Sequence, residues 1–147
     1  MVVSKALTIR QPWAHAVIHG GKIIENRSWS TKFRGPVAIH AGRASEEGPF
    51  FDFVRDRSLI ETIGFTREET PDLPRGAVVG IVDIVDCVAS DPSPWFEGPY
   101  GFVLENPRPI RPIPCKGAMQ IFDLPQNVID EIAEQLRCTQ TYKSPPP

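Results

Sequence analysis

Residues 7–29 read LTIRQPWAHAVIHGGKIIENRSW, and this stretch sets the frame for the rest of the chain. Hydrophobic residues 6–9 predict a strand, Pro12 suits the first turn of a helix, and Gly20 with Gly21 suits its end. A second strand is predicted to begin near Lys22. This unit places both ends of the helix at one rim of a sheet, with cationic and aromatic groups nearby. We expect that rim to suit a flat anionic ligand.

Outside this stretch the sequence predicts mainly strands. Segments rich in Val, Ile or alternating hydrophobic residues, bounded by turn-forming residues, lie at 37–41, 77–88, 101–106 and 119–122. The segment 77–88 has the strongest pattern, so we expect it to be central. Four prolines between residues 107 and 114 keep the next segment extended and off any central pairing position.

Helices are predicted where hydrophobic residues recur at helical spacing, at residues 46–63 and 125–136. Connections are expected at residues 28–35, 66–75 and 95–100. Successive strands with few helices and many prolines favour a mixed α/β fold of the α+β type. Its expected form is a small β-barrel flanked by helices, not a parallel α/β sheet.

The length of 147 residues and the hydrophobic content of 41% are ordinary for one globular domain. We expect it to span residues 1–138, followed by a Pro-rich C-terminal tail at 139–147 with little to bury. No run approaches the roughly 18 apolar residues of a membrane span, and no secretory signal is recognised. We therefore expect a cytoplasmic protein with no membrane association. Cys87, Cys115 and Cys138 are odd in number and widely spaced, which fits reduced thiols.

Charge is distributed unevenly along the chain. Residues 1–43 hold seven basic residues and one acidic residue, a net charge of +6, whereas the remainder carries −8 and the whole chain −2. Local charge sets the electric field at a cleft, so a basic third could form one patch. Charge alone equally allows these side chains to scatter over the surface.

Lys22, Glu25 and Arg27 form the most informative polar cluster. Glu25 and Arg27 share a strand face, and Lys22 points to the other unless Gly21 bends the entry. Arg offers a planar fork of donors, Glu accepts from an exocyclic amine, and Lys supplies a point charge, so together they could bind a phosphate and a base edge. The alternative is a surface ion pair between Glu25 and Arg27, worth under about 1 kcal/mol.

Two tryptophans flank this cluster. Trp13 shares the buried helix face with Val17, so we expect it to be at least partly buried. Trp29 follows beside a polar loop and is the better candidate for stacking on an unpaired base, which contributes roughly 1 to 3 kcal/mol.

The histidines raise the question of a metal. His15 and His19 point the same way from the helix, as in a helical zinc half-site, and His40 could be a third ligand. Ala16 stands where a metalloprotease would carry its glutamate, so we expect a solvated helix face and no metal. His40 lies near a predicted strand end, where side chains commonly face ligands.

Several segments resemble the ASCH domain family over residues 6–122. They read ALTIRQPWA, GGKIIENRSW, VAIHAG, VVGIVDIVDCV, GPYGFVLENPRPI and PCKGAMQIF. The family signature of glycine, lysine, glutamate and arginine is met by Gly20, Lys22, Glu25 and Arg27. The resemblance implies a PUA-like fold, a β-barrel flanked by helices, with a cleft proposed to bind RNA or another nucleic acid.

Some relatives within this family are enzymes. Bacterial members hydrolyse the amide of N4-acetylcytidine with the signature lysine and a threonine, but this chain carries Glu25 at the place of that threonine. Another member is a metal-dependent ribonuclease on single-stranded RNA, so a divalent metal is possible if this chain is a ribonuclease. The resemblance maps no catalytic residues of that ribonuclease onto this chain.

The leading hypothesis is a module that binds single-stranded or modified RNA, with no cofactor. The expected nucleic-acid-binding residues are Arg10, Gln11, Trp13, Lys22, Glu25, Arg27, Trp29, His40 and Lys116. The alternative is a hydrolase of RNA or of a modified nucleoside, in which Lys22 and Glu25 transfer protons. A small molecule or a protein could also occupy the same cleft.

Overall fold

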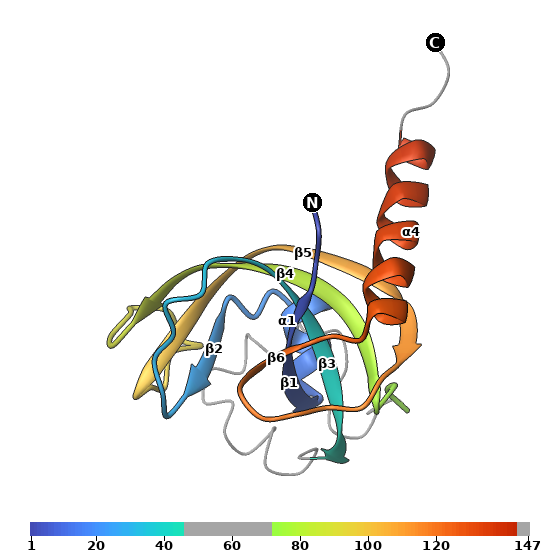
Figure 1. Cartoon of the computed structure of the whole chain (residues 1–147). Helices are drawn as coiled ribbons and strands as arrows, with labels where there is room; N and C mark the ends of the chain where they lie inside the picture. Colours follow the sequence, from blue (N-terminus) through green and yellow to red (C-terminus); the bar gives the residue numbers. More distant parts are fainter. Residues whose placement is uncertain (46–71, 144–147) are drawn as a thin grey trace.

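The computed structural model describes residues 1–45 and 72–143 (Figure 1). Its elements, in chain order, are β1 (Lys5–Gln11), α1 (Trp13–His19), β2 (Ile24–Arg27), β3 (Gly35–Ser45), β4 (Ala77–Val88), β5 (Tyr100–Pro114), β6 (Ile121–Asp123) and α4 (Gln126–Lys143). The helix predicted at residues 46–63 lies outside the described residues, as does most of the connection predicted at 66–75. None of the described helices has the length and hydropathy needed to cross a bilayer.

The six described strands form one open, strongly arched sheet in the order β2-β5-β4-β3-β1-β6 (Figure 1). Of the described pairings, that of β1 with β3 is parallel and the others are antiparallel. The α+β class is therefore confirmed, but the expected closed barrel is wrong for this sheet. Strand β2 has four residues and pairs with β5, while β1 already pairs with β3 and β6, so no ladder joins β2 to β1.

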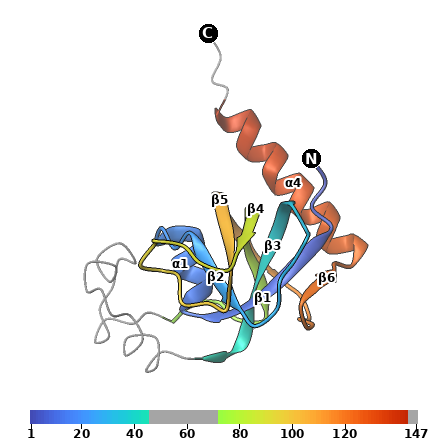
Figure 2. The same cartoon turned by 90° about the vertical axis from the view of Figure 1, so that its left-hand side faces the viewer.

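Two hydrophobic clusters pack on opposite faces of the sheet because side chains alternate along each strand. On the concave face, α1 packs against residues that include Leu7, Ile39 and Phe102. On the other face, α4 packs through Val128 and Ile132. Figure 2 shows α1 and α4 on different sides of the strands, with α4 projecting beyond the sheet. The concave face, with α1 inside the arch, is the one that positions the site.

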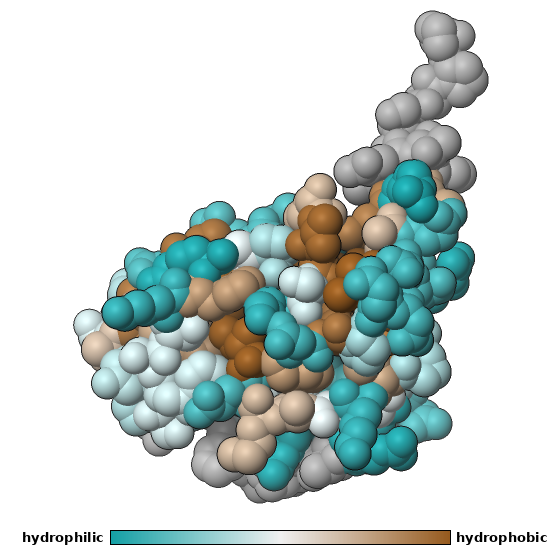
Figure 3. Space-filling model, viewed as in Figure 1, coloured by the Kyte–Doolittle hydropathy of each residue, from teal (hydrophilic) through white to brown (hydrophobic). Residues whose placement is uncertain are grey.

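Residues on the surface are mixed in character. Figure 3 shows hydrophobic residues at the centre of the side seen in Figure 1 and toward α4, bordered by hydrophilic ones. The large exposed hydrophobic residues include Val2 and Met119. Replacement of such isolated exposed side chains costs little folding stability.

Several element boundaries differ from the predictions. Strand β4 has the predicted bounds and pairs on both sides, which confirms its central position. Strand β5 continues through the four prolines, which is tolerated because β2 pairs only with its first four residues, Tyr100 to Val103. Helix α4 runs to Lys143, so it passes the predicted start of the tail at residue 139.

Candidate functional site

A pocket of about 790 Å³ opens where the end of β1, the start of α1, β2 and the β5–β6 connection meet. We call it the tryptophan pocket. Its lining residues are Thr8, Ile9, Arg10, Trp13, Lys22, Glu25, Asn26, Arg27, Ser28, Trp29, Glu97, Ala118, Met119 and Gln120. This volume falls within the range typical of small-ligand sites. Six of the nine predicted binding residues are therefore brought to one pocket.

Glu25 lies at the centre of an ion-pair triad in this pocket. Its Oε1 accepts a hydrogen bond from Lys22 Nζ at 2.9 Å. Its Oε2 accepts two from Arg27, from Nε at 3.0 Å and from Nη2 at 2.8 Å. Arg27 Nη2 also donates to the Thr8 carbonyl oxygen at 2.7 Å, so this side chain bridges β2 and β1 across the opening of the sheet.

Gly21 explains why Lys22 reaches Glu25. Its φ of +71° is favourable for glycine and turns the chain just before β2. Lys22 thus precedes the strand, its backbone N–H donates to Ala16 O at 3.0 Å, and its Nζ donates to the Ile24 carbonyl. Its ammonium also lies 5.3 Å from the centre of the Trp13 ring, within reach of a cation–π interaction. The chain therefore does bend at Gly21, so Lys22 lies on the same side as Glu25 instead of on the opposite face of the strand.

Lys22 and Glu25 are buried, and Arg27 is half-buried. The Lys22 and Glu25 side chains are 2% and 9% exposed. The ion pair between Glu25 and Arg27 that the sequence suggested as an alternative does form, but its carboxylate is buried, so its expected place on the surface is wrong. Burial raises the pKa of Glu25, but the charges and hydrogen bonds of Lys22 and Arg27 outweigh burial and hold it below its usual value. Glu25 is therefore ionised at neutral pH and orients two cations, and the triad carries a net charge of +1.

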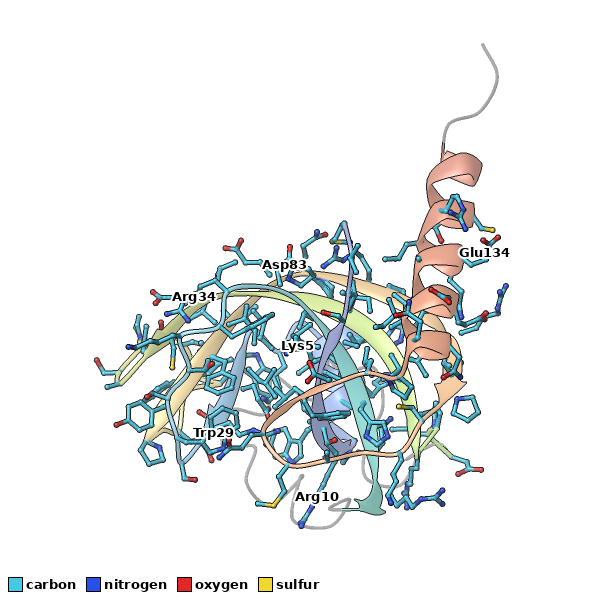
Figure 4. The ribbon with its side chains drawn as sticks, in the orientation of Figure 1. Lys5, Arg10, Trp29, Arg34, Asp83 and Glu134 are labelled. Atoms are coloured by element: carbon cyan, nitrogen blue, oxygen red, sulfur yellow. The ribbon has the colours of Figure 1, made fainter. Side chains whose placement is uncertain are left out.

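Both tryptophans are half-buried in the pocket wall. Trp13 is partly buried, as predicted. Trp29 packs edge-on against Phe102, with ring centroids 5.1 Å apart, so it belongs to both the core and the pocket. Arg10 is exposed at the pocket edge, and Figure 4 shows it and Trp29 on the same lower side of the molecule.

Asn26 and Glu97 are pocket residues that the sequence did not single out. Asn26 Oδ1 accepts from the backbone N–H groups of Glu97 and Gly98 at 2.8 and 3.1 Å, and its Nδ2 donates to Trp95 O at 3.0 Å. These bonds fasten the β4–β5 connection to β2. The position of Asn26 between Glu25 and Arg27 is the sequence feature that could have indicated its role. Its hydrogen-bond partners, however, lie about 70 residues away in sequence.

His40 and Lys116 lie in a second pocket of about 700 Å³, which we call the histidine pocket. Its lining residues are Thr8, His40, Gly42, Arg43, Gly76, Pro114, Cys115, Lys116 and Gly117. Thr8 lines both pockets. The structure thus separates His40 and Lys116 from the Lys22 triad and adds Arg43, which the sequence patterns did not select.

His40 is buried beneath the histidine pocket. Its Nε2 donates to the Cys115 carbonyl oxygen at 2.6 Å, and its Nδ1 lies 3.1 Å from Thr8 Oγ1. Burial lowers the pKa of His40; the Cys115 carbonyl opposes this effect and the Arg43 charge adds to it. The imidazole is therefore neutral at neutral pH and serves to hold the β5–β6 connection against β1 and β3.

Gln11 and the helical histidines lie outside both pockets. The buried Gln11 side chain accepts from the His15 backbone N–H and donates to Pro74 O, each at 3.0 Å. The His15 and His19 rings are 4.8 Å apart. Within residues 1–45 and 72–143, no group of three or more His, Cys, Asp or Glu is placed to hold a metal.

The basic third does not form one patch. Arg10, Lys22 and Arg27 line the tryptophan pocket with Glu25 and Glu97, which leaves a net charge of +1. Lys5 pairs with Asp123, and Arg34 lies 3.7 Å from Asp86. Figure 4 shows Lys5, Arg10 and Arg34 at well-separated places.

The family model of the ASCH domain matches residues 7–111. Activating signal cointegrator 1 from Homo sapiens is 30% identical over 131 residues, and its Mus musculus counterpart is 29% identical over 132 residues. Each alignment covers 83% of this chain and 22% of the relative, so the chain spans about a fifth of the length of these relatives. Since the family model covers well over half of the sequence, the chain belongs to the ASCH domain family.

Proposed function

We propose that this chain is a nucleic-acid-binding module and that the tryptophan pocket binds a base of single-stranded or modified RNA. The observation that carries the proposal is the buried carboxylate of Glu25, which fixes the Arg27 guanidinium in a pocket walled by Trp13 and Trp29. Membership of the ASCH domain family supports the same class of ligand.

The pocket offers complementary surfaces to a nucleobase. Half-buried aromatic rings provide a flat apolar wall on which a base can stack. Arg27 supplies a planar donor group, and none of the hydrogen bonds among the described residues uses its Nη1. Because Nε and Nη2 are held by Glu25 and Thr8, the guanidinium is oriented before a ligand arrives, which lowers the entropic cost of binding.

The same geometry favours binding over hydrolysis. A general base needs a carboxylate that can take a proton from the ligand. Both oxygens of Glu25 already accept hydrogen bonds from cations, and its pKa lies below the usual value, so it is a weak base. Glu25 acts here as a positioning residue for Lys22 and Arg27.

Met119→Glu tests the proposal with little risk to folding. Met119 lines the tryptophan pocket and is 88% exposed. A carboxylate there should weaken binding of a labelled single-stranded RNA by roughly tenfold in fluorescence anisotropy, because like charges oppose association. The matched control is Val2→Glu, since Val2 is 74% exposed and lines neither pocket.

Two results would overturn this assignment. One is a wild-type chain that does not bind single-stranded RNA at low salt. The other is an equal loss of RNA affinity in Met119→Glu and Val2→Glu. Incubation of the chain with labelled RNA and modified nucleosides, with and without a divalent metal, tests the hydrolase alternative. A product that requires Lys22 would replace the binding module by an enzyme.

A further inference from the structure

We propose that the histidine pocket is a phosphate subsite, which holds the backbone of the same RNA strand whose base occupies the tryptophan pocket. The inference rests on the proposed function and makes it more specific: the preferred ligand is a polynucleotide, and a lone nucleoside fills only half of the site.

The two pockets differ in charge as expected if one binds a phosphate and the other binds a base. Arg43 and Lys116 are the charged residues that line the histidine pocket, both are exposed, and together they give +2. The tryptophan pocket is nearly balanced and aromatic. An anionic phosphate is therefore favoured in the histidine pocket and a neutral base in the tryptophan pocket.

Arg43 lies beside Gly76 in the lining of the histidine pocket. Gly76 N–H donates to Ala41 O at 2.7 Å, and Gly76 O accepts from Cys115 N–H at 3.1 Å, so this residue joins β3 to the end of β5. Gly76 has φ +66°, and a Cβ there would lie 3.4 Å from Arg43 Cζ. The guanidinium thus lies beside Gly76, whose left-handed φ favours glycine, and its planar fork of donors suits a phosphate.

Lys116 is held by the connection between β5 and β6. His40 Nε2 bonds the carbonyl of Cys115, and a Cβ at Gly117 would come within 2.7 Å of the His40 ring. His40 is consequently a positioning residue below the subsite, and Lys116 above it is exposed.

The two pockets adjoin along this same connection. Residues 115–117 line the histidine pocket and residues 118–120 line the tryptophan pocket, and Thr8 lines both. Thr8 Oγ1 lies 3.1 Å from the His40 ring and 3.3 Å from the Ala118 carbonyl oxygen. Because two residues of chain span at most about 7 Å, Lys116 and Ala118 are close enough for neighbouring parts of one nucleotide strand. Figure 1 shows the connection between β5 and β6 crossing the lower ends of β1 and β3.

The test compares the double variant Arg43→Ala/Lys116→Ala with Arg34→Ala/Lys32→Ala. Both remove one exposed arginine and one exposed lysine, but Arg34 and Lys32 line neither pocket. Ligands are nucleosides of the four bases, the same nucleosides with a 5′- or a 3′-phosphate, and short single-stranded oligoribonucleotides. Affinity is measured by calorimetry or anisotropy across a salt titration.

The wild-type chain should bind an oligoribonucleotide more tightly than a nucleoside, and one of the two phosphate isomers should recover part of that gain. Arg43→Ala/Lys116→Ala should bind the oligoribonucleotide roughly tenfold or more weakly, as expected for hydrogen bonds between charged groups. The steepness with which the logarithm of the binding constant falls against the logarithm of the salt concentration should also decrease, by about 0.7 for each phosphate that the variant no longer neutralises. Nucleoside affinity should stay unchanged, and Arg34→Ala/Lys32→Ala should behave like wild type.

Equally weakened binding in the two double variants would overturn the phosphate subsite while leaving the base pocket intact. The same holds if the phosphate groups add nothing to nucleoside affinity. If the wild-type chain binds neither nucleosides nor oligoribonucleotides, the proposed function fails and the subsite fails with it.

Discussion

Lys22 Nζ and Glu25 Oε1 are 2.9 Å apart in a buried ion pair, three residues from one another in sequence. Arg27 approaches the other oxygen of the same carboxylate. In this chain the lysine, glutamate and arginine of the family signature thus place one carboxylate between two cations. Its integrity has consequences for stability as well as for binding.

Replacement of Lys22 by methionine should be strongly destabilising. Methionine keeps much of the side-chain volume but leaves Glu25 without one of its charge partners in a buried position. Removal of one partner from a buried pair costs about 3–5 kcal/mol, which denaturant unfolding would measure. Lys5→Met is the control, because it removes the exposed pair with Asp123, which should cost under about 1 kcal/mol. Similar destabilisation in both variants would contradict the role of burial.

The contribution of Glu25 should depend on pH in a defined window. Its folded pKa is lowered from the ordinary value of 4.5, so its stabilisation is fully present above 4.5 and is lost as pH falls through the folded pKa. The difference in unfolding free energy between wild type and Glu25→Gln should therefore be constant near neutral pH and shrink below 4.5. A difference that grew on acidification would have the wrong sign.

His40 should titrate below its ordinary value. Its folded pKa is lowered from 6.5, so the neutral ring stabilises the fold above 6.5 and this contribution is lost as pH falls through the folded pKa. NMR titration of the His40 ring would measure the shift directly. In His40→Gln, stability should decline less between neutral and mildly acidic pH than in wild type. An imidazole that protonates above 6.5 would refute the buried neutral ring.

Gly21→Ala should be destabilising even though nothing lies within 4 Å of the added Cβ. The cost of about 1 kcal/mol comes from the φ of +71°, which a Cβ disfavours. Gly21→Asn should cost less, because asparagine tolerates left-handed backbone. Thermal unfolding of the two variants distinguishes backbone strain from steric overlap, since overlap would make the larger asparagine worse.

Local signals predicted much of the fold. Pro12 and Gly20 bound α1, and the Val- and Ile-rich segment 77–88 became β4 with the predicted limits. Whether the sheet closes into a barrel could not be predicted in this way, and the expected closure is wrong. Closure depends on whether β2 and β1 can pair, and β6, three residues long, occupies the edge of β1 instead.

The candidate site was predictable only in part. Six of the predicted site residues lie within 20 residues of one another, in the short unit of β1, α1 and β2, and therefore reach one pocket. They are Arg10, Trp13, Lys22, Glu25, Arg27 and Trp29. Sequence patterns do not indicate Asn26, because its hydrogen-bond partners belong to the β4–β5 connection, which is distant in sequence. No sequence pattern indicates Arg43, because its place in the histidine pocket depends on Gly76 and Cys115, which join β3 to the end of β5.

The amino-acid sequence alone indicates the Lys22, Glu25 and Arg27 cluster, the aromatic residues beside it and the main strand that supports it. Those features depend on residue type and short spacing. The burial of Glu25 between two cations and the place of His40 and Lys116 in a second, neighbouring pocket are visible only in the folded structure. Burial and proximity follow from how distant strands pair and how an open sheet curves around α1, and no stretch of neighbouring residues encodes them alone.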